Sequence, residues 1–190
     1  MIIIRPEQPQ DEEALFQMYR RACGRLHEAR LLDTLRENRR LFLSLAAWQE
    51  NQAVGGVAFS SASLALPVPE LTLAALAPLA VLPAQRRQGI GSTLVRLGLQ
   101  RCRERQVDGV VVVGDPAWWG KFGFVAAAAY NWRGEPPIPA PFWLVQELRP
   151  DALPKTPSTI VLAPELGEFL AAWQEVLILP ADPAPVHREP

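Results

Sequence analysis

The chain has 190 residues, which suits one domain with a modest extension, and its 49% hydrophobic and 21% charged composition supports a buried core and excludes a disordered chain. Nineteen basic and twenty acidic residues leave a net charge of -1, which argues against a nucleic-acid-binding face. The isoleucines at residues 2–4 are too few for a signal peptide, and no apolar run approaches the roughly 18 residues of a transmembrane helix. We therefore expect a soluble, cytoplasmic protein that does not contact membranes. Cys23 and Cys102, the only cysteines, predict neither a disulfide framework nor a cysteine-based zinc site.

The first third of the chain alternates between strand and helix patterns. Residues 2–5 predict a short strand, and residues 11–22 predict an amphipathic helix that opens with three acids, as the helix dipole favours. A second helix is expected over residues 28–38. Residues 41–48 and 52–60 are strand-compatible and flank a short polar turn, which predicts an antiparallel hairpin.

The middle of the chain predicts a strand–helix–strand unit. Residues 71–82 form an apolar run that contains Pro78, so a bulge or a break in pairing is expected near that proline. The unbroken valines of residues 107–114 indicate a strand buried on both faces, as in a parallel pair. A right-handed crossover should connect the two strands.

The helix that connects these strands is expected over residues 89–106, where the apolar period changes to 3.6. Gly91 and Gly98 fall on its buried stripe. Two glycines at these positions would let the helix lie close to the sheet.

The last part of the chain is rich in proline. Asp115 should cap a short helix and residues 122–127 look like another strand. Twelve of the nineteen prolines lie at or after Pro136, which predicts short extended pieces and turns there. Residues 168–179 have helical spacing and are expected to pack on the domain or on a second copy of the chain, which leaves a homodimer open.

The segment at residues 81–92 carries the clearest chemical signal. It joins the end of a strand to the start of a helix, whose first amides have no acceptors within the helix. Glycines at 89 and 91 remove side chains that would keep a ligand away, and Arg86 and Arg87 add positive charge. These features predict an anion site suited to a pyrophosphate. The segment matches neither a Walker loop, which needs a lysine, nor a complete dinucleotide fingerprint, which needs a third glycine.

These residues resemble the GNAT superfamily of N-acetyltransferases. The family's acetyl-CoA motif is Arg or Gln, two residues, Gly, one residue, then Gly or Ala, and Arg86, Gly89 and Gly91 match it. The run VVVVGDPAWWGKFGF at 110–124 looks like the family's second signature, and together with the stretch PPIPAPFWLVQEL it is similar to a YhbS-like subset. The resemblance covers residues 2–150.

The resemblance implies an α/β fold with a mixed central sheet flanked by helices. Its central parallel pair, residues 71–82 and 108–113, would be splayed so that the pantetheine arm of acetyl-CoA enters between the strands. An amine of a small molecule or a protein would then attack the thioester directly, without a metal and without nucleic acid. The residues that the resemblance assigns to acetyl-CoA are Val81, for main-chain pairing with the pantetheine, and Arg86, Arg87, Gln88, Gly89, Ile90, Gly91 and Ser92, for the pyrophosphate.

One position departs from the family pattern. Many members place a tyrosine four residues before the glycine of the Gly-Phe pair, where its hydroxyl can protonate the CoA thiolate, and here that position is Trp119. An indole N–H donates a hydrogen bond but is no useful general acid. The alternative to an N-acetyltransferase is therefore a catalytically silent GNAT fold that binds CoA or acyl-CoA. Trp118 and Trp119 either pack in the core or line the acyl-CoA cleft.

Further polar residues have a functional and a structural interpretation. Glu70 precedes the strand at 71–82, where some family members keep a general base, but a solvated loop carboxylate is the more common role. Asp115 is expected to be a helix cap rather than a base. Tyr130 would supply the missing phenol if the chain doubled back, although a surface aromatic is the expected role. His27 and His187 are expected to be solvated, with no metal-ligand spacing nearby.

The chain is expected to divide into an acetyl-CoA-binding domain over residues 1–150 and a proline-rich extension over residues 151–190. The acceptor pocket should be built from the helices at 11–38 and from variable loops, so the acceptor cannot be read from the sequence.

Overall fold

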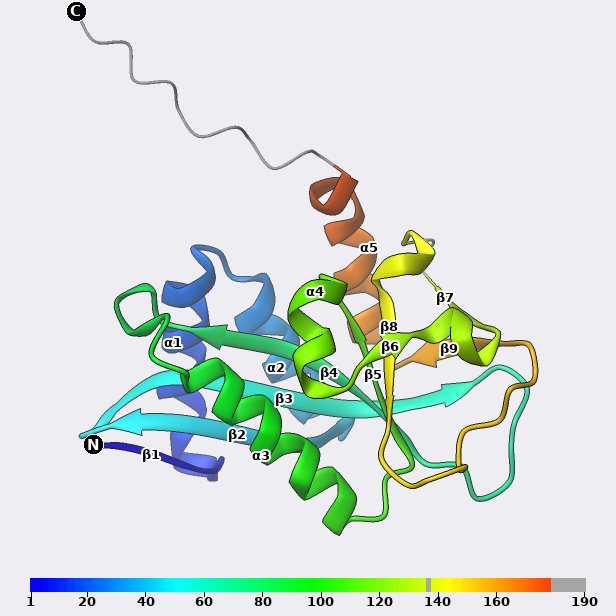
Figure 1. Cartoon of the computed structure of the whole chain (residues 1–190). Helices are drawn as coiled ribbons and strands as arrows, with labels where there is room; N and C mark the ends of the chain where they lie inside the picture. Colours follow the sequence, from blue (N-terminus) through cyan, green and yellow to red (C-terminus); the bar gives the residue numbers. More distant parts are fainter. Residues whose placement is uncertain (136–137, 179–190) are drawn as a thin grey trace, which may run out of the picture.

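A nine-stranded mixed sheet forms the centre of the protein in the computed structural model, which describes residues 1–135 and 138–178 (Figure 1). The strand order is β1-β2-β3-β4-β5-β8-β6, and β9 pairs with both β3 and β7. The strands are β1 (Ile2–Pro6), β2 (Leu41–Gln49), β3 (Gln52–Leu64), β4 (Leu73–Val81), β5 (Gly109–Val113), β6 (Val125–Ala126), β7 (Trp132–Gly134), β8 (Trp143–Glu147) and β9 (Ser158–Leu162).

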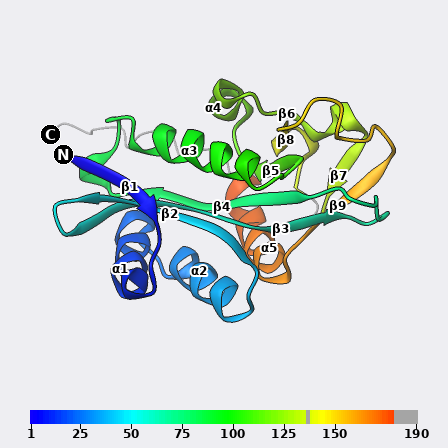
Figure 2. The ribbon, with the colours of Figure 1, turned by 90° about the horizontal axis from the view of Figure 1, so that it is seen from below.

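Helices cover both faces of this sheet. Figure 2 shows α1, α2 and α5 on one face and α3 and α4 on the other. The helices are α1 (Glu12–Cys23), α2 (His27–Glu37), α3 (Ile90–Glu104), α4 (Pro116–Trp119) and α5 (Pro164–Ile178), with 3-10 turns at η1 (Pro9–Asp11), η2 (Pro83–Gln85), η3 (Gly120–Phe122), η4 (Ala127–Tyr130) and η5 (Ala140–Phe142). Within the described ranges, no helix has the length and apolarity needed to cross a membrane. The predicted α/β class with a mixed sheet and flanking helices is confirmed.

The hairpin expected from the sequence is present. β2 and β3 pair antiparallel, and Gln49 faces Gln52 across the turn. β1 adds to the outer side of β2 in antiparallel register. Polar turn residues separate the two apolar strand patterns, so neighbouring residues in the sequence were enough to predict this hairpin.

The parallel pair at the centre of the sheet is short and then opens. β4 and β5 pair at three registers, Leu73 with Gly109, Ala74 with Val110 and Ala75 with Val111, although β4 continues to Val81. Proline has no N–H to donate, and the register between β3 and β4 shifts beside Pro78, as the sequence predicted. The carboxyl halves of β4 and β5 are therefore splayed.

Helix α3 lies close to the sheet at one glycine. A Cβ on Gly98 would lie 2.5 Å from Cε2 of Phe59 and closer still to Cζ, so no larger residue fits without movement. A Cβ on Gly91 would meet Val81 Cγ2 at 3.6 Å, which is an ordinary contact. The expectation that both glycines permit close packing is thus confirmed for Gly98 and wrong for Gly91, where a Cβ would fit.

The strand expected over residues 122–127 is mostly wrong. Only Val125–Ala126 forms β6, and the preceding residues form the 3-10 turn η3. Gly123 ends this turn with φ of +88°, a left-handed conformation that interrupts an extended run. Phe122 and Phe124 are apolar because both are buried against Trp119 of α4, and not because they belong to a strand.

The segment beyond residue 150 adds one strand and one helix to the fold. β9 pairs antiparallel with the end of β3 and parallel with β7. On α5, Leu166 and Leu170 are buried in the same cluster as Leu31 and Leu35 of α2, and Asn38 donates to Glu165 at 2.6 Å. These contacts place α5 against α2. The division at residue 150 and the homodimer stay predictions.

Candidate active site

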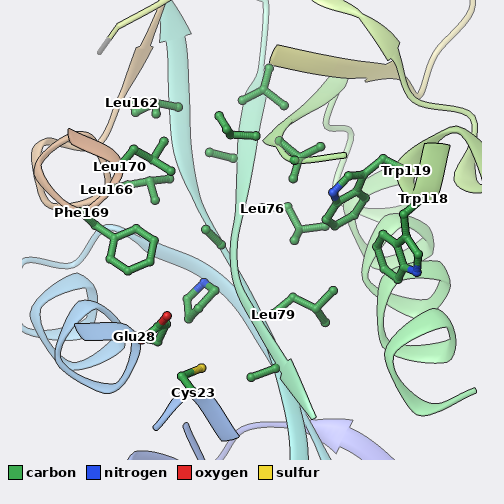
Figure 3. Close-up of a pocket in the computed structure, with 18 of the residues that line it drawn as sticks. Cys23, Glu28, Leu76, Leu79, Trp118, Trp119, Leu162, Leu166, Phe169 and Leu170 are labelled. Atoms are coloured by element: carbon green, nitrogen blue, oxygen red, sulfur yellow. The ribbon is translucent and has the colours of Figure 1, made fainter. Parts of the chain in front are cut away.

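A cavity of about 660 Å³ occupies the space between the splayed halves of β4 and β5 (Figure 3). Most of the residues that line it are aliphatic. Pockets that bind small molecules or cofactors usually have this volume and a mostly apolar lining. Its walls are β4 from Ala75 to Val81, the β5 end from Val111 to Gly114, the indoles of Trp118, Trp119 and Trp143, the α1–α2 corner at Ala22, Cys23, Arg25 and Glu28, Arg86, and Leu162, Leu166, Phe169 and Leu170 near the C-terminus.

The glycine-containing loop follows the β4 wall directly. Gly89 has φ of +80° and caps α3, and its exposed position leaves open space where a Cβ would stand. The first backbone bond of α3 runs from the Thr93 N–H to the Gly89 carbonyl at 2.9 Å. The amides of residues 90–92 therefore precede the helical ladder and, with the positive end of the helix dipole, form a surface suited to an anion.

The two arginines of this loop have different environments. Arg86 donates through Nε to the Val81 carbonyl at 3.1 Å and through Nη2 to the Ala22 carbonyl at 2.8 Å. Arg86 thus links the end of β4 to the end of α1, and two of its donors are already used inside the protein. Arg87 is exposed in a left-handed conformation with φ of +62°. The sequence treated both as equivalent charges; in the structure both are exposed, and Arg86 is in addition tethered to two backbone carbonyls.

Trp118 and Trp119 line the cavity and also pack against each other. Their rings are 4.6 Å apart and nearly perpendicular, and Trp119 meets Phe124 at 5.2 Å. Trp119 is only 7% exposed, and its indole covers Gly114 at the end of β5. Both residues therefore pack against aromatic neighbours and line this cavity, and its role as the acyl-CoA cleft stays a prediction.

The two carboxylates weighed as bases lie outside the cavity lining. Glu70 is exposed in a left-handed turn with φ of +66°. It precedes the N-terminal end of β4, which pairs with β5, whereas the splay is at the C-terminal end of β4. Asp115 accepts a hydrogen bond from the Ala117 N–H at 2.9 Å and caps α4, as expected.

Tyr130 and His27 are also absent from the cavity lining. The Tyr130 hydroxyl donates to Glu147 at 3.4 Å, and burial raises the pKa of Tyr130, so the phenol does not replace the missing tyrosine. His27 is exposed, and His187 lies outside the described residues. Among the residues that the structure describes, no group of three or more His, Cys, Asp or Glu could hold a metal ion.

One carboxylate in the cavity was not singled out by the sequence. Glu28, in the first turn of α2, has a side chain only 7% exposed; its Oε1 lies 3.3 Å from Nη2 of Arg25, and its Oε2 is buried without a hydrogen-bond partner. Burial raises the pKa of Cys23 to about 11, and the negative charge of Glu28 adds to the shift. Residue 28 appeared only as the start of a predicted helix, since no local motif marks a carboxylate buried by distant elements.

The geometry combines an anion-binding loop, an apolar slot through the sheet and a buried carboxylate. An elongated ligand with phosphates at one end would reach from the loop into the splay. A second molecule entering from the α1–α2–α5 face would meet its reactive end there. Because apolar walls exclude water, such a site favours direct transfer between two bound molecules.

Comparisons with known proteins agree with this architecture. The Acetyltransferase (GNAT) family matches residues 7–124. The chain is 37% identical over 153 residues to the uncharacterised N-acetyltransferase YhbS of Escherichia coli K12, covering 80% of this chain and 90% of that protein. It is 33% identical over 129 residues to a second uncharacterised N-acetyltransferase of the same strain, YjhQ, covering 67% and 68%.

Two solved structures are similar over most of the chain. The crystal structure of YhbS from Escherichia coli in complex with CoA superposes with a TM-score of 0.82 at 33% identity, covering 87% of this chain and 91% of that one. A GNAT family acetyltransferase from Brucella melitensis in complex with acetyl-CoA gives a TM-score of 0.72 at 27% identity, covering 87% and 98%.

Proposed function

Because the chain belongs to the GNAT acetyltransferase family, we propose that it is an acetyl-CoA-dependent N-acetyltransferase that modifies an amine of a small molecule or a protein. The observation that carries this proposal is the cavity between splayed β4 and β5, which opens beside the Gly89 loop. The CoA and acetyl-CoA bound in the two similar structures support the same ligand here.

In this proposal the loop holds the pyrophosphate and β4 guides the pantetheine. Backbone amides at the start of α3 would donate to the phosphates, and exposed Arg87 would add charge. The full set of proposed cofactor-binding residues is Val81, Arg86, Arg87, Gln88, Gly89, Ile90, Gly91 and Ser92. Arg86 acts here mainly by fixing the Val81 carbonyl and the α1 end, because two of its donors bind backbone carbonyls there.

Acetyl transfer depends more on how the amine and the thioester are positioned than on acid–base catalysis by side chains. A neutral amine attacks the thioester carbonyl carbon, the C–N bond forms, the C–S bond breaks with its electron pair on sulfur, and the nitrogen loses one proton to solvent. Thiolate is a good leaving group, so water can protonate it after departure. The Trp119 indole forms a wall and lacks a titratable proton, so any acid assistance from this position is absent.

A CoA-binding protein without turnover is the second proposal, and the packing of Trp119 favours it. The ring occupies the position of the family's tyrosine and is held between Gly114, Trp118 and Phe124. Both proposals require the same cofactor loop. They differ only in whether acetyl groups are transferred.

Release of free thiol from acetyl-CoA across a panel of amines distinguishes the two proposals. Binding itself is tested by calorimetry with Gly89→Asp, which places a carboxylate and a Cβ at the predicted phosphate position. Gly24→Asp is a matched control, because Gly24 is also left-handed, with φ of +70°, and a Cβ there also meets open space. Both variants should lose similar stability, and only Gly89→Asp should lose CoA binding. Tight binding by a folded Gly89→Asp variant would overturn the assignment.

A further inference from the structure

The buried carboxylate of Glu28 has one oxygen that the protein does not use. Its Oε2 is shielded from solvent and has no hydrogen-bond partner. Buried carboxylates are normally paired and hydrogen-bonded, because desolvating the charge is costly. An unpartnered oxygen on a side chain that lines a cavity therefore indicates a place for a cationic or hydrogen-bond-donating ligand.

The position of Glu28 separates it from the proposed cofactor side. Figure 3 shows Glu28 between Cys23 and Phe169, on the opposite side of β4 from Trp118 and Trp119. This is the side covered by α1, α2 and α5, whereas α3 and α4 lie on the other face (Figure 2). Glu28 is thus placed to meet a second ligand that approaches the splay from the helix side.

The surroundings of Glu28 limit what that ligand can be. Leu162, Leu166, Phe169 and Leu170 line this side of the cavity, and the strand wall adds Pro78. Hydroxyl or further charged groups on a ligand would lose their water here without finding partners. The wall therefore favours an apolar body attached to a single charged group.

Three other polar side chains lie near the Glu28 carboxylate or near Cys23. Arg25 contacts Oε1 from the α1–α2 connection, with its Nε at 3.3 Å, and leaves Oε2 open. The Cys23 thiol remains neutral at physiological pH because its pKa is raised to about 11. Arg86, tethered to the Ala22 and Val81 carbonyls, is the next cation. Arg25 and Arg86 thus place positive charge on this side of the cavity, and Oε2 of Glu28 has no hydrogen-bond partner.

We propose that Glu28 receives the ammonium group of the acceptor and that the acceptor is a small primary amine on an apolar, aromatic or aliphatic body. This inference rests on the proposed acetyltransferase function. The Glu28 carboxylate takes one proton from the ammonium, and the freed lone pair attacks the acetyl carbonyl. The C–N bond forms, the C–S bond breaks with its electron pair on sulfur, and the positively charged nitrogen loses a second proton to water. The thiolate takes a proton from water, and Glu28 returns its proton to solvent. The balance is ammonium plus acetyl-CoA giving amide, CoA thiol and one released proton.

The test compares full-length wild type with Glu28→Gln, which keeps the shape and removes the charge. Glu165→Gln is the matched control, since Glu165 also has a buried Oε2 without a hydrogen-bond partner but does not line the cavity. The probes are 2-phenylethylamine, 2-phenylethanol with the same body and no charge, glucosamine with a polar body, and a lysine peptide. Calorimetry measures binding of each probe with and without CoA, and thiol release measures KM and kcat.

The expected result is binding and acetylation of 2-phenylethylamine in preference to the other probes. A charge-assisted hydrogen bond typically contributes about 1.5–3 kcal/mol, so Glu28→Gln should weaken amine binding and raise its KM by about 10- to 150-fold. Acetyl-CoA affinity should stay unchanged in Glu28→Gln, and Glu165→Gln should behave as wild type. A merely structural role for Glu28 would instead alter both ligands together.

The inference is overturned if 2-phenylethylamine does not bind, if Glu28→Gln binds it as well as wild type, or if glucosamine or the lysine peptide is preferred. Failure of the proposed function has a separate signature. In that case acetyl-CoA itself does not bind to wild type, or it binds without thiol release, while the direct binding of the amine probe still reports on Glu28. Unfolding curves for each variant exclude loss of fold as the cause.

Discussion

Replacing Gly114 with Ala should destabilise the protein by forcing Trp119 out of its position. A Cβ on Gly114 would lie 2.8 Å from Cδ1 of Trp119 and closer still to Nε1. Carbon atoms pack at about 3.5–4.0 Å, so one of the two groups must move by most of an ångström or more. The ring is backed by Trp118 and Phe124, which leaves the cavity as the direction with room.

The magnitude follows from two opposing terms. Overpacking a close-packed site typically costs about 1–3 kcal/mol. Gly114 is not left-handed, so Ala adopts its backbone without strain and gains about 0.4–1 kcal/mol from the unfolded chain. The net expectation is a loss of about 1–2 kcal/mol in the free energy of unfolding. Because Trp119 lines the cavity, acetyl-CoA affinity should fall as well.

Urea unfolding followed by circular dichroism tests this with a double-mutant cycle. In a Trp119→Leu background the clash is absent, so Gly114→Ala should cost nothing or be slightly stabilising. Gly120→Ala is the matched control, because a Cβ there has nothing within 4 Å. An unchanged midpoint for Gly114→Ala, or the same cost in both backgrounds, would refute the close contact between Gly114 and Trp119.

Three further predictions concern the loop, the indole and an ion pair. Arg87→Ala should flatten the salt dependence of acetyl-CoA binding in calorimetry, whereas Arg86→Ala should mainly lower the urea midpoint because its donors serve backbone carbonyls; equal salt slopes in the two variants would contradict this division. Trp119→Tyr should raise the rate of thiol release, since aligned acid catalysis contributes about 10²–10⁴-fold, and a folded variant that loses turnover would show a direct role for the indole. Asp11→Asn should cost about 1.5–3 kcal/mol at pH 7, because hydrogen bonds from Arg5, one of them 2.9 Å long, hold the pKa of Asp11 below its usual value. That stabilisation is present above the usual aspartate pKa of about 3.9 and is lost as the pH falls through the lower pKa of the folded protein. The difference between the urea midpoints of wild type and Asp11→Asn should therefore disappear in acid. A difference that persists in acid would exclude the ionic contribution.

The sequence by itself determined the features that local forces set. The hairpin of β2 and β3, the cap at Asp115 and the turn at Gly89 depend on periodicity, on hydrogen bonds between near neighbours and on backbone freedom, all of which act within a few residues. The break beside Pro78 was also predictable, because a missing N–H is a property of the residue itself. These local features predicted the loop after β4, whereas the splay of the parallel pair was implied by the resemblance to the GNAT superfamily.

Long-range packing decided the roles of individual side chains. Arg86 was read as a phosphate-binding cation, yet one of its donors binds the Ala22 carbonyl, 64 residues away in the chain. Phe122 appeared to belong to a strand and instead packs under α4, because Gly123 turns the chain. Such partners cannot be inferred from neighbouring residues.

The acceptor side of the cavity was decided by the tertiary structure alone. Glu28 is buried because α2 meets β4 and because α5 returns from the end of the chain to lie against α2. No local pattern distinguishes it from other glutamates at helix starts, since the cost of burying its charge and the need for a partner arise only after these distant elements have packed. The glycine-containing loop that we propose binds the cofactor could therefore be predicted from twelve consecutive residues, while the proposed acceptor site required the whole fold.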